Sequence, residues 1–164
     1  MLTVLRRLAL IVTLMFWQGG FMFYGAVVVP VGSEVLGSHR EQGFVTRSVT
    51  NYLNGAGLLC LAVWCWDVFQ GRTNGSKWNR LKWVLWATLV AALALQGWLH
   101  LRLDDLLDPQ AFKILDRPGF NRLHQWYLIV STLQWIGAII LAGLTIWTWK
   151  ESDAASGRQS VKPG

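Results

Sequence analysis

The sequence has little charge and almost no cysteine, and both shortages narrow the class of protein. Charged residues make up 15% of the 164 residues, whereas an average soluble domain is about 25% charged. A soluble nucleic-acid-binding protein needs a charge-rich surface, so the composition argues against DNA or RNA as a partner, despite a net charge of +6. The two cysteines, Cys60 and Cys65, lack the CxxC spacing of redox sites.

Charge is missing altogether from four long stretches. No Asp, Glu, Lys or Arg occurs in Leu8–Ser33, Ser48–Trp66, Trp83–Leu101 or Leu123–Trp149. A helix crosses the bilayer core with roughly 17 to 25 apolar residues, and it satisfies its own backbone hydrogen bonds in lipid. The sequence therefore predicts an all-α, four-span transmembrane helix bundle in residues 1–150, with spans at about 8–31, 48–69, 83–103 and 123–149. The polar tail 151–164 is expected to be disordered.

The charges that remain are unequal on the two sides of such a bundle. The side of the termini carries Arg6, Arg7, Arg72, Lys77, Arg80, Lys82, Lys150, Arg158 and Lys162. Few acids offset them there, whereas acids and bases balance on the other side. Cytoplasmic loops carry the excess of Lys and Arg, which predicts cytoplasmic termini and a bacterial-type inner membrane. Tryptophan prefers the headgroup level, and Trp64, Trp66, Trp147 and Trp149 are interpreted as such anchors.

Polar side chains recur on the faces that the predicted spans present to one another. The amides in these faces are Gln18, Asn51, Asn54, Gln96 and Gln134. Two interpretations are open. The amides hydrogen-bond one another and fix the register of the helices, or they line a small polar pocket that opens to the outer side.

Two histidines flank the second outer loop. His100 ends the third span and His124 begins the fourth, while Asp104 follows His100 at helical spacing. A carboxylate can orient a metal-binding imidazole in this way, so the set could hold copper, or haem b between two axial histidines. The alternative is an interfacial histidine that bonds a loop carbonyl. No nucleophile and base occur at a recognisable spacing, so an enzyme is the less favoured class.

The second outer loop carries signals for a helix of its own. Asp108 and Pro109 are typical of a helix start, and Arg117, Pro118 and Gly119 are interpreted as its end. The apolar residues of this loop make it amphipathic, so the loop predicts a short helix lying on the outer membrane surface; they are Leu106, Leu107, Phe112, Ile114 and Leu115.

Short motifs resemble a known family. They are Trp17 to Gly20, then Phe23, Gly25 and Pro30 in the first span, and Phe120 to His124 before the last. These resemble the transmembrane-protein-205-like four-helix membrane family, a domain of unknown function, although Val49 to Tyr52 lack the proline that often opens the second helix there. A more distant similarity is to copper-resistance D-like membrane proteins. The resemblance implies a fold up to about Trp149 and no reaction.

Three functions are compatible with these features. The first is a small integral membrane protein whose outer polar pocket binds a ligand or a partner subunit. The second is a redox subunit that binds haem b or copper through His100 and His124, and the third is an oligomeric channel or transporter. The expected partners are the lipid bilayer and a membrane protein or a second copy of the chain, with no nucleic acid.

Overall fold

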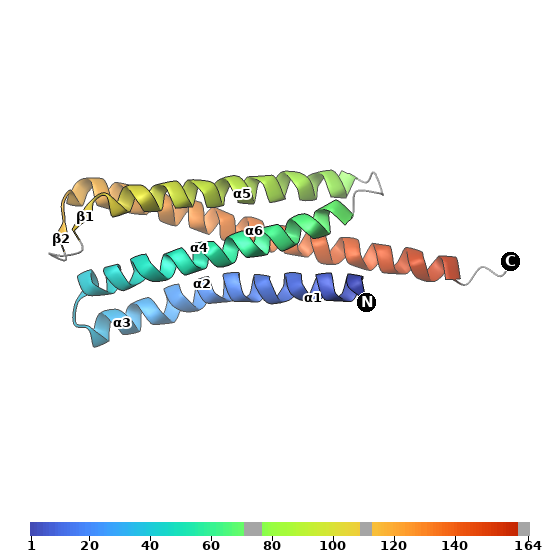
Figure 1. Cartoon of the computed structure of the whole chain (residues 1–164), viewed down its shortest axis with the longest axis horizontal. Helices are drawn as coiled ribbons and strands as arrows, with labels where there is room; N and C mark the ends of the chain where they lie inside the picture. Colours follow the sequence, from blue (N-terminus) through green and yellow to red (C-terminus); the bar gives the residue numbers. More distant parts are fainter. Residues whose placement is uncertain (71–76, 109–112, 161–164) are drawn as a thin grey trace.

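The computed structural model describes residues 1–70, 77–108 and 113–160, except for the side chains at positions 39, 40, 157, 159 and 160. Within these residues the chain forms four helical rods, and both ends of the chain lie at the same end of the molecule (Figure 1). The rods that are long and apolar enough to span a membrane are Leu2–Val35, Glu41–Gln70, Lys77–Asp104 and Arg117–Ser156. The prediction of an all-α protein is confirmed, and each predicted span lies within one of these four candidate spans.

The first rod alternates between α and π geometry. It consists of α1 (Leu2–Leu14), η1 (Met15–Gly19), α2 (Gly20–Phe23), η2 (Tyr24–Val28) and α3 (Val29–Val35). Pro30 explains η2, because proline has no N–H and its ring clashes with the carbonyl four residues earlier. The N–H of Val29 instead bonds the carbonyl of Tyr24, five residues back, and this wider turn makes room for the ring.

Three longer helices complete the bundle, namely α4 (His39–Gln70), α5 (Lys77–Asp104) and α6 (Arg117–Ser160). Gly37 adopts a φ of 62° in the turn from α3 to α4, a conformation that a Cβ disfavours. α4 packs against both α1 and α5, and α5 packs along α6. α6 passes behind α4 in Figure 1. The two helices are joined by a hydrogen bond of 3.0 Å, which the indole N–H of Trp64 donates to Thr145 Oγ1.

The loop between α5 and α6 differs from the prediction wherever it is described. Its described residues include two paired strands, β1 (Leu107–Asp108) and β2 (Lys113–Ile114), while residues 109–112 of the predicted amphipathic helix lie outside the described ranges. Arg117 begins α6 and does not end a helix. The reason is local, since Asp116 Oδ1 accepts the N–H of Gly119 at 3.1 Å as a cap, and Pro118 lies in the first turn, where no donor is needed.

The polar tail is a second correction. Of the tail expected to be disordered, residues 151–160 continue α6 as far as Ser160, and residues 161–164 lie outside the described ranges. A long-range ion pair supplies a reason, because Arg7 in α1 binds Asp153 through two hydrogen bonds of 2.8 Å. Glu151 adds a contact within the helix by accepting the indole N–H of Trp147 at 3.0 Å.

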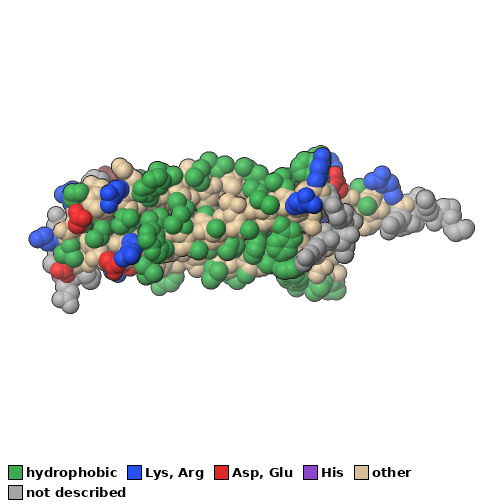
Figure 2. Space-filling view, turned by 90° about the horizontal axis from the view of Figure 1, so that it is seen from above, with side chains coloured by type: hydrophobic (Ala, Val, Ile, Leu, Met, Phe, Trp, Pro, Cys, Tyr) green, Lys and Arg blue, Asp and Glu red, His purple; other side chains and the backbone are tan. Residues whose placement is uncertain are grey.

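The closest packing lies in the half of the bundle near the termini. Cys60, Trp64, Val68 and Leu141 are completely buried there. Trp64 is therefore a core residue and not the headgroup anchor that the sequence suggested. Apolar side chains are spread over the middle of the face shown in Figure 2, and charged side chains gather at its two ends. This pattern is consistent with a multi-pass membrane protein.

Candidate functional site

Asp67 is the centre of an ionic cluster that joins all four rods. Its side chain is 2% exposed and lies in the last turn of α4. Lys82 of α5 places Nζ 3.1 Å from Asp67 Oδ2, and Arg6 of α1 places Nε 3.1 Å from Oδ1. The indole N–H of Trp149 in α6 donates to the same Oδ1 at 2.9 Å. The carboxylate is thus bound by one group from each of the other rods.

The surroundings of Asp67 require such partners. The C-terminal end of a helix carries partial negative charge, and α4 has no basic residue of its own in its last turn. A buried carboxylate also loses its hydration, which costs several kcal/mol unless cations and hydrogen bonds replace it. Lys82 is buried to a similar degree, at 3% exposed, and donates a further hydrogen bond to Thr148 Oγ1 at 3.2 Å.

Arg7 forms a second bridge beside this cluster. Its two terminal nitrogens bind the two carboxylate oxygens of Asp153, each at 2.8 Å, in the bidentate geometry that suits guanidinium. Its guanidinium also lies over the ring of Trp149, 5.0 Å from the centroid. The start of α1 is thereby attached to the end of α6.

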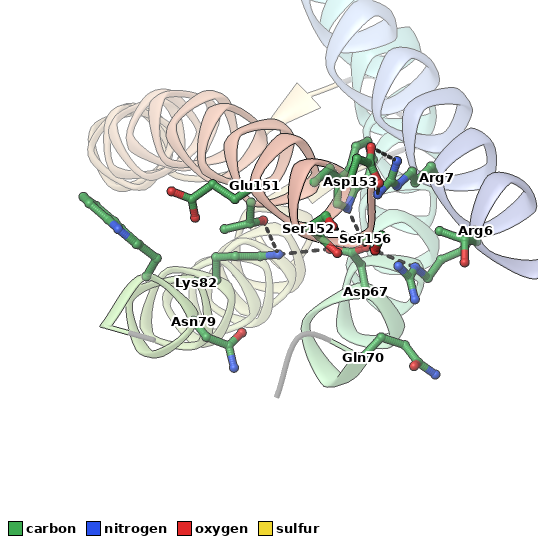
Figure 3. A pocket seen from close by; sticks show the side chains of 14 residues that line it. Arg6, Arg7, Asp67, Gln70, Asn79, Lys82, Glu151, Ser152, Asp153 and Ser156 are labelled. Atoms are coloured by element: carbon green, nitrogen blue, oxygen red, sulfur yellow. Dashed lines mark hydrogen bonds and ion pairs between the residues drawn. The ribbon is translucent and has the colours of Figure 1, made fainter. Parts of the chain in front are cut away.

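The two bridges form part of the wall of a cavity at this end of the bundle, shown in Figure 3. Its volume is about 480 Å³, within the range of small-molecule sites. The side chains that line it are Thr3, Arg6, Arg7, Asp67, Gln70, Trp78, Asn79, Lys82, Thr148, Trp149, Glu151, Ser152, Asp153 and Ser156. The lining combines ionic groups with hydroxyls, amides and indoles, so it suits a polar ligand.

Positive charge exceeds negative charge at the base of the cavity. Arg6 and Lys82 share the single carboxylate of Asp67. Nε of Arg6 is close enough for an ion pair but is not aligned for a hydrogen bond. Asp153 is occupied by Arg7, and Figure 3 shows the carboxylate of Glu151 turned away from Asp67.

The predicted amide set is only partly assembled. Gln96 donates to Ser131 Oγ at 2.9 Å, and Gln134 donates to the carbonyl of Leu89 at 3.3 Å. Gln18, Ser131 and Gln134 line one small cavity, in which Gln18 Oε1 has no hydrogen-bond partner among the described residues. That cavity measures about 10 Å³, enough for a single water molecule. A cavity of this size favours the interpretation that these amides fix the register of the helices over the one in which they bind a ligand.

The two asparagines of the set have different surroundings. Asn54 accepts a hydrogen bond from the hydroxyl of Tyr127 at 3.4 Å and is half-buried. Asn51 is exposed on the outside of α4 and does not join the other amides. The two side chains differ by only about 60° in direction around the helix, so the edge of the covered face of α4 falls between them.

The residues of the predicted metal site are not gathered into one. His100 is buried, with Nε2 3.8 Å from Asp104 Oδ2, while Asp104 Oδ1 binds Arg47 at 2.5 Å. His124 is exposed and stacks on Phe120 with ring centroids 5.9 Å apart. Within the described part of the chain, no three His, Cys, Asp or Glu side chains lie close enough to hold a metal ion. His100, His124 and Asp104 therefore do not form a three-ligand metal cluster.

From the sequence, Lys82 is one of the basic charges on the side of the termini, and Asp67 is not singled out. A signal for their burial was nevertheless present in their neighbours. Asp67 stands between Trp66 and Val68, and Lys82 stands between Leu81 and Trp83. A lone charge inside an apolar segment is usually buried with a partner of opposite sign, so these two residues were candidates for one ion pair.

Comparison with protein-family models, with curated proteins and with solved structures finds no match for this chain.

Proposed function

We propose that this chain is a multi-pass membrane protein that binds a polar ligand in the cavity at the end of the bundle where both termini lie. The observation that carries the proposal is the buried carboxylate of Asp67, which is bound by groups from three other rods in the wall of a 480 Å³ cavity. Buried ionic groups in membrane proteins commonly mark functional sites. This location replaces the outer polar pocket as the first place to search for a ligand.

The distribution of charge supports a cytoplasmic position for the cavity. Lysine and arginine are in excess on the side of the termini, and such residues remain on the cytoplasmic side of a membrane. In a bacterial-type inner membrane, the ligand would then reach the site from the cytoplasm or from the inner leaflet. The likeness to the transmembrane-protein-205-like family remains a proposal about fold and adds no activity.

Native mass spectrometry of the gently solubilised full chain tests the proposal. The wild type is expected to carry a bound adduct. Ser152→Trp should lose it, because the indole would fill the cavity that Ser152 lines. Thr132→Trp is the matched control, since Thr132 lies on the same helix, is exposed and does not line the cavity.

Two results would contradict the proposal. One is a wild-type spectrum with no adduct beyond detergent. The other is an adduct that Ser152→Trp and Thr132→Trp retain equally, because its site would then lie elsewhere on the protein.

A further inference from the structure

We infer that the ligand of this cavity carries an anionic phosphate group, which Arg6 and Lys82 bind next to Asp67. The inference rests on the proposed function and specifies the ligand chemistry. A free phosphorylated molecule and a lipid headgroup share this chemistry, so they are two sources of one ligand class.

The positive charges of the cluster outnumber its negative charge. Arg6 and Lys82 bring two positive charges to one carboxylate, so one positive charge stays uncompensated among side chains that are 14% exposed or less. Desolvated charge is costly without a counter-ion. Among the described residues, the other two acids of the lining do not compensate it, because both oxygens of Asp153 bind Arg7, while Glu151 points away from Asp67 in Figure 3 and accepts the indole N–H of Trp147. A bound anion would neutralise the base of the cavity.

Arg6 has more hydrogen-bond donors than Asp67 can accept. Guanidinium has five N–H donors, and the ion pair of Arg6 among the described residues joins Nε to Asp67 Oδ1 at 3.1 Å. Oδ1 of Asp67 accepts from Trp149 and Oδ2 accepts from Lys82, so each oxygen keeps about one further acceptor position. Several donors of Arg6 are therefore left for another acceptor.

The donors around Asp67 come from several directions. In Figure 3, Arg6 and Lys82 approach Asp67 from opposite sides, while Ser152 and Ser156 lie on the α6 wall. A tetrahedral phosphate accepts hydrogen bonds in several directions at once, and arginine matches its oxygens with two parallel donors. A carboxylate ligand has fewer acceptor positions for a guanidinium, an ammonium and hydroxyls.

Thermal unfolding of the full chain in an uncharged detergent tests the inference with two probes. Inorganic phosphate is compared with chloride at equal ionic strength, and phosphatidylglycerol is compared with phosphatidylcholine. Stabilisation by phosphate identifies a free phosphorylated ligand, and stabilisation by phosphatidylglycerol alone identifies a lipid headgroup. Unchanged unfolding temperatures with both probes would overturn the inference.

Variants show whether the stabilisation arises in the cluster. Arg6→Gln makes the cluster neutral and should weaken apparent phosphate or lipid binding about tenfold, as expected for a lost charge-assisted hydrogen bond. Arg6→Lys preserves the charge and should keep much of the effect. Arg102→Gln is the control, because Arg102 is exposed at the opposite end of α5. Equal responses from all three variants would also overturn the inference.

The two proposals fail in different ways. A wild type that carries a cavity adduct in native mass spectrometry, yet responds to neither probe, contradicts the phosphate chemistry and leaves ligand binding standing. A wild type with no adduct and no response contradicts both proposals.

Discussion

Replacement of Asp67 by Asn is the sharpest test of the ionic cluster. Asn has nearly the same shape and still accepts the indole N–H of Trp149, so the change removes charge with little change in packing. Lys82 and Arg6 then have no counter-ion at the base of the cavity, although Lys82 keeps its hydrogen bond to Thr148 at 3.2 Å. Removing one partner of a buried ion pair costs about 3 to 5 kcal/mol, and these surviving bonds indicate the lower end, about 3 kcal/mol.

The measurement is unfolding by sodium dodecyl sulfate in mixed micelles, followed by tryptophan fluorescence in phosphate-free buffer. Adding Lys82→Met to Asp67→Asn should recover part of the loss, because the double variant no longer buries that unpaired ammonium. Asp105→Asn is the control, since Asp105 is 68% exposed in its pair with Arg102, and its loss should cost less than about 1 kcal/mol. A free energy of unfolding for Asp67→Asn within error of the wild type would refute the reasoning. So would a double variant no more stable than the single one.

Two further predictions concern contacts between helices, and the same unfolding assay checks both. A Cβ at Gly57 would lie 2.8 Å from the indole of Trp17, so Gly57→Ala should destabilise the protein by about 1 to 3 kcal/mol. Gly55→Ala has open space and should stay within about 0.5 kcal/mol of the wild type; equal effects would refute the close approach. Gln96→Leu should cost only about 1 kcal/mol, because Ser131 Oγ still donates to a backbone carbonyl at 2.8 Å. A loss well above 2 kcal/mol would show that this amide does more than fix register.

The positions of the helices were predictable because lipid imposes one rule on the whole chain. A segment in the hydrocarbon must pair its own backbone N–H and C=O groups in hydrogen bonds. A long run without charge is therefore predicted to be a helix without knowledge of the segments that pack against it. An even number of such helices returns the chain to its starting side, and both termini do lie at one end. The helical tail beyond residue 150 was not predictable, since its anchor is Arg7, far away in sequence.

The assembly of side chains depended on the rotation and depth of each helix. Asn51 and Asn54 share one face of the helix by their spacing, yet only Asn54 contacts α6, because the edge of the covered face falls between them. His100 and His124 flank one loop, but one is buried and the other is exposed. Helical spacing alone showed which polar residues share a face of their helix. It did not show which of these faces packs against a neighbouring helix.

The sequence by itself determined that this chain forms four helices long and apolar enough to cross a membrane, with its charges near their ends. Hydrophobic length and the pairing of backbone N–H and C=O groups within one helix are local properties of each segment. Only the tertiary structure decided that Arg6, Asp67, Lys82 and Trp149 meet. These residues belong to four different rods, and a pairing between rods depends on packing that no single segment encodes. The candidate site is therefore a product of the bundle, although each of its members is visible in the sequence.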